Sequence, residues 1–289
     1  MKRPAAVKAK MGVKKKPAAA KAKAKMRVTT KHNHSIRLDD FEGPHNYPAH
    51  VAATICDLPK VVSMIEEPDD IMEAFSNPRL ILKALEHGMR AIRAMDKDNG
   101  WDLASPPVCN IAFKEIYRRS PLLLMLSPPC TMFSCLQRIN WETMDPNVLT
   151  IRCKDAVLML NIAIWMARFQ WTQNRFFCIE HPASASSWER PEMQWLRGLE
   201  GVRMVTFDQC QYGLISKQLK SPMQKRTRFL TNMKEIYDEF EGRLCPGGHD
   251  HCPIIGMEGG MKRSVWAQRY PDVLCHAICA AVEKNKADD

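Results

Sequence analysis

The sequence predicts an α/β protein with a mostly parallel sheet and helices on both faces. Short apolar segments typical of buried strands alternate with longer helical patterns along the chain. Residues 121–126, PLLLML, form an unbroken apolar run of the kind found in strands that are buried on both faces. With 289 residues and 45% apolar content, the chain is long enough for one sizeable core plus an appendage.

The beginning of the chain differs in composition from the rest. Residues 1–27 contain eleven Lys and Arg and no acid, whereas the remaining 31 basic residues face 32 acidic ones. This segment has little to bury, so we predict a disordered Lys/Ala/Pro-rich tail and linker over residues 1–50 and one globular domain over residues 51–289. Lys clusters bind phosphates or act as nuclear import signals, which favours a nucleic-acid partner and the nucleus over a merely solubilising run.

Two further observations concern the surroundings of the protein. The first residues are charged and no run of eighteen apolar residues occurs, so we expect neither a secretory signal nor a membrane partner. The eleven cysteines are an odd number scattered through apolar segments, which indicates free thiols in a reducing compartment.

The elements of the domain follow in order. Ser76-Asn77-Pro78 predicts a helix start and Gly88 its end, because a capping residue precedes Pro in the first turn. Asn99-Gly100 predicts a turn. We further predict strands over Met89–Met95, Pro121–Leu126, Arg175–Ile179, Val202–Phe207 and Arg226–Leu230, and helices over 110–118, Val148–Trp171 and within 263–284, with a break at Pro271.

Reactive side chains stand where these strands end or begin. Cys130 ends the segment that follows the PLLLML strand, Glu180 closes the next strand and Asp96 closes an earlier one, while QKRTR, residues 224–228, begins another. Because ligands bind at the carboxyl ends of strands in open α/β sheets, we expect a thiol, carboxylates and guanidinium groups around one cleft.

These segments resemble motifs of the C5-cytosine-specific DNA methyltransferase family. SPPCTMFS is similar to its Pro-Cys-Gln loop with a trailing Phe-Ser, IEHP to its Glu-Asn-Val motif and QKRTR to its Gln-x-Arg-x-Arg motif, in the family's order. Residues 73–103 resemble the cofactor half, and the resemblance covers roughly residues 71–279. It implies a Rossmann-like fold of S-adenosylmethionine-dependent methyltransferases and transfer of a methyl group to C5 of cytosine, that is, DNA methylation.

The resemblance also implies roles for individual residues. Cys130 would attack C6 of the cytosine, helped by nearby cations that lower the pKa of its thiol, and Glu180 would hold the N3/N4 edge of the base. Arg226 and Arg228 would hold the base carbonyl, a phosphate or the active-site loop. In a duplex, the target base must leave the stack to reach Cys130.

For S-adenosylmethionine, the resemblance implies a second group of residues. Asp96 would accept the ribose hydroxyls, with Asp98 as its rival, and Asp102 would meet the adenine. The residues Phe75, Ser76 and Pro129 would line the rest of the cofactor site, next to backbone N–H groups at the start of the helix that follows.

The chain departs from the family in several places. AFSNP contains no glycine where the family has a Phe-x-Gly-x-Gly loop, Thr131 replaces the loop Gln, and His181 replaces the Asn. No target-recognition region is recognisable after Arg228, so target choice would come from a protein partner, from the tail, or be loose. Two alternatives stay open: a catalytically inactive methyltransferase-like nucleic-acid-binding protein, such as a mobile-element remnant, or the same chemistry on RNA.

A short segment near the end of the chain, CPGGHDHC, offers four soft ligands: Cys245, His249, His251 and Cys252. Such ligands bind zinc, but the spacing fits no common zinc finger, and a polar loop is the alternative. The predicted active site itself contains no metal.

Overall fold

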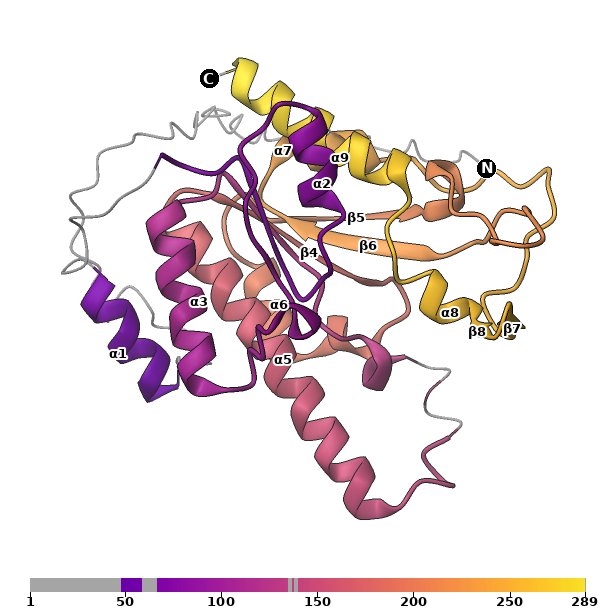
Figure 1. The fold of residues 1–289 in the computed structure, drawn as a ribbon, viewed down its shortest axis with the longest axis horizontal. Helices are drawn as coiled ribbons and strands as arrows, with labels where there is room; N and C mark the ends of the chain where they lie inside the picture. The colour runs from indigo at the N-terminus through magenta and orange to yellow at the C-terminus, as the bar shows by residue number, and fades with distance from the viewer. Residues whose placement is uncertain (1–47, 59–66, 135–136, 138–139, 289) are drawn as a thin grey trace, which may run out of the picture.

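The sheet at the centre of the molecule has six strands, in the order β2 (Ala94–Met95), β1 (Ile71–Ala74), β3 (Leu123–Leu126), β4 (Phe176–Pro182), β6 (Arg226–Thr231) and β5 (Arg203–Asp208). Figure 1 labels β4, β5 and β6 within it. The structure is a computed structural model, and it describes residues 48–58, 67–134, 137 and 140–288. Strands β2, β1, β3 and β4 are parallel, and β6 lies antiparallel between β4 and β5. The predicted α/β class with a mostly parallel sheet is confirmed.

Helices cover both faces of this sheet. One face packs against α1 (Ala49–Asp57), α3 (Pro106–Arg119), α5 (Pro146–Thr172) and α6 (Pro191–Arg197). The other packs against α2 (Leu80–Glu86), α7 (Lys234–Phe240) and α9 (Asp272–Asp288). The remaining elements are the short helix α8 (Arg263–Trp266), the hairpin of β7 (Met257–Glu258) and β8 (Met261–Lys262), and the 3-10 turns η3 (Lys97–Asn99), η4 (Thr131–Phe133), η5 (Ser186–Glu189) and η6 (Gln209–Tyr212).

Side-chain alternation along β3 shows how the two cores form. Leu124 and Leu126 lie in the core beneath α3 and α5, whereas Leu123 and Met125 lie in the core beneath α2 and α9. All four are buried, so PLLLML supplies apolar groups to both faces, as predicted for a parallel strand covered on each side.

The structure differs from the sequence-based prediction around α2, β2 and β1. The helix predicted to start at Ser76-Asn77-Pro78 begins at Leu80, because the Glu73 carboxylate, and not the Ser76 side chain, accepts the Ile81 backbone N–H (2.5 Å). The strand predicted over Met89–Met95 is reduced to its last two residues. Strand β1 was not predicted, because Glu73 interrupts its apolar pattern.

Strand β4 also extends further than predicted. It continues to Pro182, so Glu180 and His181 lie within the strand and face opposite sides of the sheet. The helix predicted over Val148–Trp171 and the turn at Asn99-Gly100 are confirmed, with Gly100 at a φ of 85°.

The tail and most of the linker, residues 1–47, lie outside the described residues, so the predictions made for them stay predictions. Among the residues that the structure describes, no helix combines the length and the apolar character needed to cross a membrane.

Candidate active site

The sheet order reverses between β1 and β3, which defines where a ligand would bind. From β1 the chain passes through α2 on one face to β2, then through α3 on the other face to β3. Such a switch point leaves a crevice outside the carboxyl ends of the two strands. The residues that follow these ends are Phe75 and Ser127, whose backbone N–H groups donate to Met95 (2.8 Å) and Ala74 (3.1 Å).

The segment Ser127–Cys130 leaves β3 at this crevice and is tied to β4. The buried His181 ring contacts the Pro128 carbonyl through Nε2 (2.9 Å) and the Ser187 hydroxyl through Nδ1 (2.6 Å). Since a carbonyl only accepts, Nε2 carries the hydrogen, and burial lowers the pKa of His181 and keeps the ring neutral. His181 therefore fixes the loop that carries Cys130.

A buried charge pair lies near the Cys130 thiol. The Lys225 ammonium is 3.3 Å from Oε1 of Glu180, and 8% of the Glu180 side chain and 14% of the Lys225 side chain are exposed. Burial and then the Glu180 charge raise the pKa of Cys130, while Lys225 opposes them. The expectation of a lowered pKa for Cys130 was therefore wrong, because the thiol is largely desolvated and a carboxylate as well as a cation stands beside it.

Tyr270 completes this group of side chains. Its hydroxyl lies 2.7 Å from the Ser127 hydroxyl, and the residue is buried. Burial, followed by the Glu180 charge, raises the pKa of Tyr270 far above its usual range, so the phenol stays protonated. Below, the strand-end cluster means Ser127, Cys130, Glu180, Lys225 and Tyr270.

The two predicted arginines do not join this cluster. Arg228 pairs in register with His181 and Phe229 with Glu180, so Arg226 and Arg228 face the side of β6 opposite to Glu180. Arg226 binds the buried Asp208 carboxylate through two hydrogen bonds (3.1 and 2.9 Å). Arg228 donates to Thr206 (3.1 Å) and lies over the Trp188 ring, 5.6 Å from its centroid.

The loop after β1 has an unusual backbone. Phe75 adopts a φ of 64°, a left-handed conformation that a bulky residue rarely takes and that marks strain at a turn. Ser76 donates to the Glu73 carboxylate (2.7 Å), which also accepts backbone N–H groups at the start of α2. Burial raises the pKa of Glu73 to about 7 despite these hydrogen bonds. The helix N-terminus predicted to offer free N–H groups is thus already occupied by Glu73.

The loop after β2 holds the other predicted cofactor residues. The Asp96 carboxylate accepts the Asp98 backbone N–H (2.9 Å), and Asn77 of the β1 loop donates to the Asp98 carboxylate (3.3 Å). Asp96, Trp101 and Asp102 are all partly exposed, and the backbone N–H of Trp101 donates to the Asp96 carbonyl (2.9 Å). Pro129, the last predicted cofactor residue, is exposed.

Three of the four predicted zinc ligands lie close together, and Cys210 takes the place predicted for Cys252. Cys245, His249 and His251 lie beside Cys210 of η6, and the ligand atoms of these four residues are all within 4.8 Å of one another. They are called the cysteine–histidine cluster below. Cys252 lies apart: its buried side chain packs in a small core with Leu214, Met223 and Ala267, and its sulfur accepts from Arg263 (3.1 Å). Inclusion of Cys252 was wrong because its side chain packs into this core instead of joining the ligand atoms of the other three residues.

A separate pocket lies between η6, α7 and α9. Its lining residues are Gln211, Tyr212, Glu239, Arg243, Val273, His276, Ala277 and Ala280. None of them belongs to the strand-end cluster. The candidate active site is therefore defined by side-chain chemistry at the strand ends rather than by this pocket.

Three members of the site region were not anticipated: Glu73, Lys225 and Tyr270. Lys225 stands inside the quoted QKRTR segment, and the alternation of side chains along a strand would have separated it from Arg226 and Arg228. An acid within an apolar strand, as at Glu73, was a second available signal. For Tyr270, which reaches Ser127 from 143 residues away, the sequence contains no such signal.

Comparison with known proteins assigns no family to the chain. No protein-family model and no curated protein matches it. The functional argument therefore rests on the side chains themselves.

Proposed function

We propose that this protein transfers a methyl group from S-adenosylmethionine to C5 of cytosine in DNA, with Cys130 as the nucleophile. The observation that carries the proposal is a partly buried thiol beside the Glu180–Lys225 pair, at the carboxyl ends of β3 and β4 and next to the switch point. A nucleophile with an adjacent proton acceptor is the arrangement that covalent catalysis requires.

The charges of the cluster give Glu180 a definite task. As long as Glu180 is ionised, its charge disfavours the Cys130 thiolate. When the thiol proton passes to Glu180, that repulsion disappears and the Lys225 ammonium remains as the neighbouring charge, which favours the thiolate. Glu180 then donates this proton to N3 of the base as sulfur bonds to C6, so the proton leaving Cys130 ends on the cytosine.

The remaining steps restore the protein. Addition at C6 breaks the aromaticity of the ring and makes C5 nucleophilic. When bound, S-adenosylmethionine supplies an electrophilic methyl group on a sulfonium. After C5 has gained the methyl group, its hydrogen leaves as a proton to solvent, the C6–sulfur bond breaks, and the N3 proton returns through Glu180 to the Cys130 sulfur.

The two arginines support the site from the other face of β6. Trp188 donates to the Pro182 carbonyl (2.8 Å), and Arg228 lies over the Trp188 ring. Of the roles considered for Arg228, holding the active-site segments is the one that its contacts favour. Arg226 fixes the β5–β6 pairing through Asp208.

The residues around the β1 and β2 ends suit an adenosine. Asp96, a partly exposed residue, follows β2 and carries a carboxylate, the group that accepts two ribose hydroxyls, and the side chain of the partly exposed Trp101 offers a flat apolar surface for a base. Asp102 is a further acceptor beside that ring. Although the loop lacks glycine, Phe75 already holds the left-handed conformation that glycine would favour there.

Covalent capture tests the proposal. A duplex containing 5-fluorocytosine forms an adduct that cannot lose fluorine as a cation, so the protein stays attached after methyl transfer. In the presence of S-adenosylmethionine, wild type and Cys153→Ser should form the adduct, whereas Cys130→Ser should not; Cys153 is a matched control because it is also a partly buried thiol. Equal capture by wild type and Cys130→Ser, measured by intact-protein mass spectrometry, would refute the assignment.

The basic residues 1–27 bear on how the protein would reach its DNA substrate. The basic residues 1–27 would contact phosphates and direct the protein to the nucleus, while target choice would come from a protein partner, from the tail, or be loose. Capture on 5-fluorocytosine RNA but not on DNA would transfer the proposal to RNA.

One observation favours the inactive alternative: the Glu73 carboxylate occupies the N–H groups at the start of α2, next to a loop without glycine. Calorimetric titration with S-adenosylhomocysteine separates the two functions. Binding that Asp96→Ala weakens by about 1.5–3 kcal/mol, the range for hydrogen bonds to charged groups, supports the methyltransferase. A folded protein that binds none, with or without DNA, supports the inactive nucleic-acid-binding protein.

A further inference from the structure

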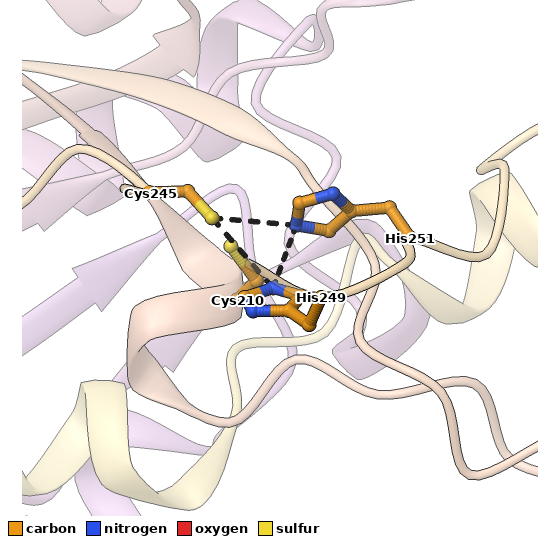
Figure 2. Close-up of side chains that lie close together, drawn as sticks. All are labelled: Cys210, Cys245, His249 and His251. Atoms are coloured by element: carbon orange, nitrogen blue, oxygen red, sulfur yellow. Dashed lines mark hydrogen bonds between the residues drawn. The ribbon is translucent and has the colours of Figure 1, made fainter. Parts of the chain in front are cut away.

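Four soft ligand groups converge beside the β5 edge of the sheet, outside the strand-end cluster. The two sulfurs of Cys210 and Cys245 and the rings of His249 and His251 point toward one another (Figure 2). Cys245 Sγ lies 3.6 Å from Nε2 of His249 and 3.5 Å from Nε2 of His251, and the two Nε2 atoms are 3.0 Å apart.

These separations suit one tetrahedral zinc ion. With Zn–S of about 2.3 Å and Zn–N of about 2.0–2.1 Å, tetrahedral angles place sulfur and nitrogen about 3.5 Å apart and two nitrogens about 3.3 Å apart. The two sulfur–nitrogen distances agree with these values, and a shift of a few tenths of an ångström in one ring brings the nitrogens into line. Two sulfurs with two imidazoles in tetrahedral array are a donor set that selects zinc.

The backbone explains why these residues meet. Gly247 and Gly248 both have a left-handed backbone, with φ of 81° and 83°, so the chain turns sharply between Cys245 and His249. The Cys245 N–H donates to the buried Asp208 carboxylate (2.9 Å), which fixes this turn to the end of β5. Cys210 stands two residues after Asp208, in η6, and so meets the turn from the sheet side.

We propose that Cys210, Cys245, His249 and His251 bind a structural zinc ion that joins the end of β5 to the segment after α7. Four protein ligands leave no open position, which is the arrangement of structural rather than catalytic zinc. Two thiolates balance the charge of the ion, so binding releases two thiol protons for each Zn²⁺ taken up. The site is independent of the proposed methyl transfer.

Metal analysis of the purified full-length protein tests the site. Wild type should contain one zinc per chain, lose it to a chelator, and regain it when titrated with ZnCl₂. Co²⁺ in place of zinc should give the visible absorption of a tetrahedral site together with sulfur-to-metal charge transfer.

Two cysteine variants identify the ligands. Cys210→Ser should weaken zinc binding by at least about 100-fold, beyond the 10- to 100-fold cost of losing an outer-shell contact. Cys252→Ser should retain zinc, although Cys252 is the cysteine adjacent to His251 in sequence. If Cys210→Ser does not fold by circular dichroism, His249→Ala replaces it, because His249 is exposed and contributes nothing to the core.

Three results would overturn the proposal. One is a folded wild type without stoichiometric zinc after titration. Another is loss of zinc in Cys252→Ser together with its retention in Cys210→Ser. A third is a wild-type mass two hydrogens lower, in a protein that takes up no zinc, which would indicate a Cys210–Cys245 disulfide instead.

Discussion

The strand-end cluster and the cysteine–histidine cluster are held in place by different parts of the fold. The first is built from the ends of β3 and β4, the residue before β6 and a residue two positions before α9, and its charged pair is buried. The second is built from a 3-10 turn and a segment without helix or strand, and its ligand groups are partly or fully exposed. The sheet therefore positions one cluster, whereas the other has few packing contacts of its own.

This difference indicates what each cluster needs. In the strand-end cluster the polar groups face partners within the cluster: Lys225 forms an ion pair with Glu180, and Ser127 shares a hydrogen bond with Tyr270. In the cysteine–histidine cluster four potential ligands face one another around a common centre, so a bound metal would supply the missing stabilisation. Core mutations should disturb the first cluster most, and removal of metal the second.

The largest effect is expected from the core beneath β6. Phe229 pairs in register with Glu180 and packs against Phe207 and Phe240, with ring centroids 4.8 and 5.0 Å away. Phe229→Ala should lower the free energy of unfolding by about 3–5 kcal/mol. The measurement is urea unfolding with a chelator present, so that metal does not contribute.

The matched control for Phe229 is Ile255→Ala, in the segment after the cysteine–histidine cluster. Ile255 is 63% exposed, so the loss should stay below about 0.5 kcal/mol. Equal losses for the two variants would contradict the contrast between a sheet-held and a loop-held cluster.

The next effect concerns pH and Glu73. Since the folded-state pKa of Glu73 is raised to about 7 from 4.5, the folded protein binds a proton that the unfolded chain has lost, and this stability is lost as the pH rises from about 4.5 to 7. A difference of this size between the folded and unfolded pKa of Glu73 corresponds to about 3 kcal/mol. Glu73→Gln should therefore become more stable relative to wild type across this window, measured by urea unfolding at a series of pH values.

The control for this pH effect is Glu258→Gln. Hydrogen bonding to Ser216 lowers the pKa of Glu258, so its contribution has the opposite sign: it is present above the unfolded pKa and is lost on acidification. A Glu73→Gln variant whose advantage does not grow between pH 4.5 and 7 would contradict the assignment of a buried, protonated Glu73.

A subtler effect concerns the Cys130 thiol. Because Glu180 raises the pKa of Cys130 and Lys225 lowers it, Glu180→Gln should shift the pH profile of Cys130 alkylation to lower pH and Lys225→Gln should shift it to higher pH. Peptide mass spectrometry after iodoacetamide treatment follows this thiol among the others. If both variants shift the pH profile in the same direction, or neither shifts it, the charges of Glu180 and Lys225 do not control the pKa of Cys130.

The smallest effect is expected from Tyr270→Phe. This change removes one buried hydrogen bond, to Ser127, and should cost about 1 kcal/mol of stability. Tyr237→Phe is the control, because the Tyr237 hydroxyl donates to Glu241 on the exposed surface. A larger loss for Tyr237→Phe than for Tyr270→Phe would contradict the buried role of Tyr270.

The strand-end residues were predictable where an apolar run in the sequence indicates the preceding strand. PLLLML located Cys130, and the apolar run before Glu180 located that carboxylate, because apolar runs indicate buried strands and the chain continues directly from them. The pairing order was not available from these runs, so β1 and the antiparallel insertion of β6 emerged only from the structure. The roles of Tyr270 and Cys210 depend on contacts between distant segments, which local periodicity does not encode.

The cysteine–histidine cluster shows the same limit in a local segment. Proximity in sequence suggested Cys252, yet the chain direction at His251 turns the next side chain into the core around Met223. Ligand sets in loops are decided by where the loop is anchored, here by the Cys245 N–H on Asp208.

The alternation within residues 224–228 has a consequence for how this chain can change. Gln224 and Arg226 donate to Asp208 and Arg228 donates to Thr206, whereas Lys225 reaches Glu180 on the other face. The even-numbered side chains of this segment therefore bind β5 on one face of the sheet, and the odd-numbered Lys225 binds Glu180 on the other face. Deletion of a single residue before β6 would shift the strand by one position and move each side chain to the opposite face. Arginine side chains would then face Glu180, and Phe229 would leave the core beneath α7 and α9. A substitution in this segment changes one contact and can be compensated by one further substitution. A one-residue shift moves every side chain of the strand to the other face, so no single substitution compensates it.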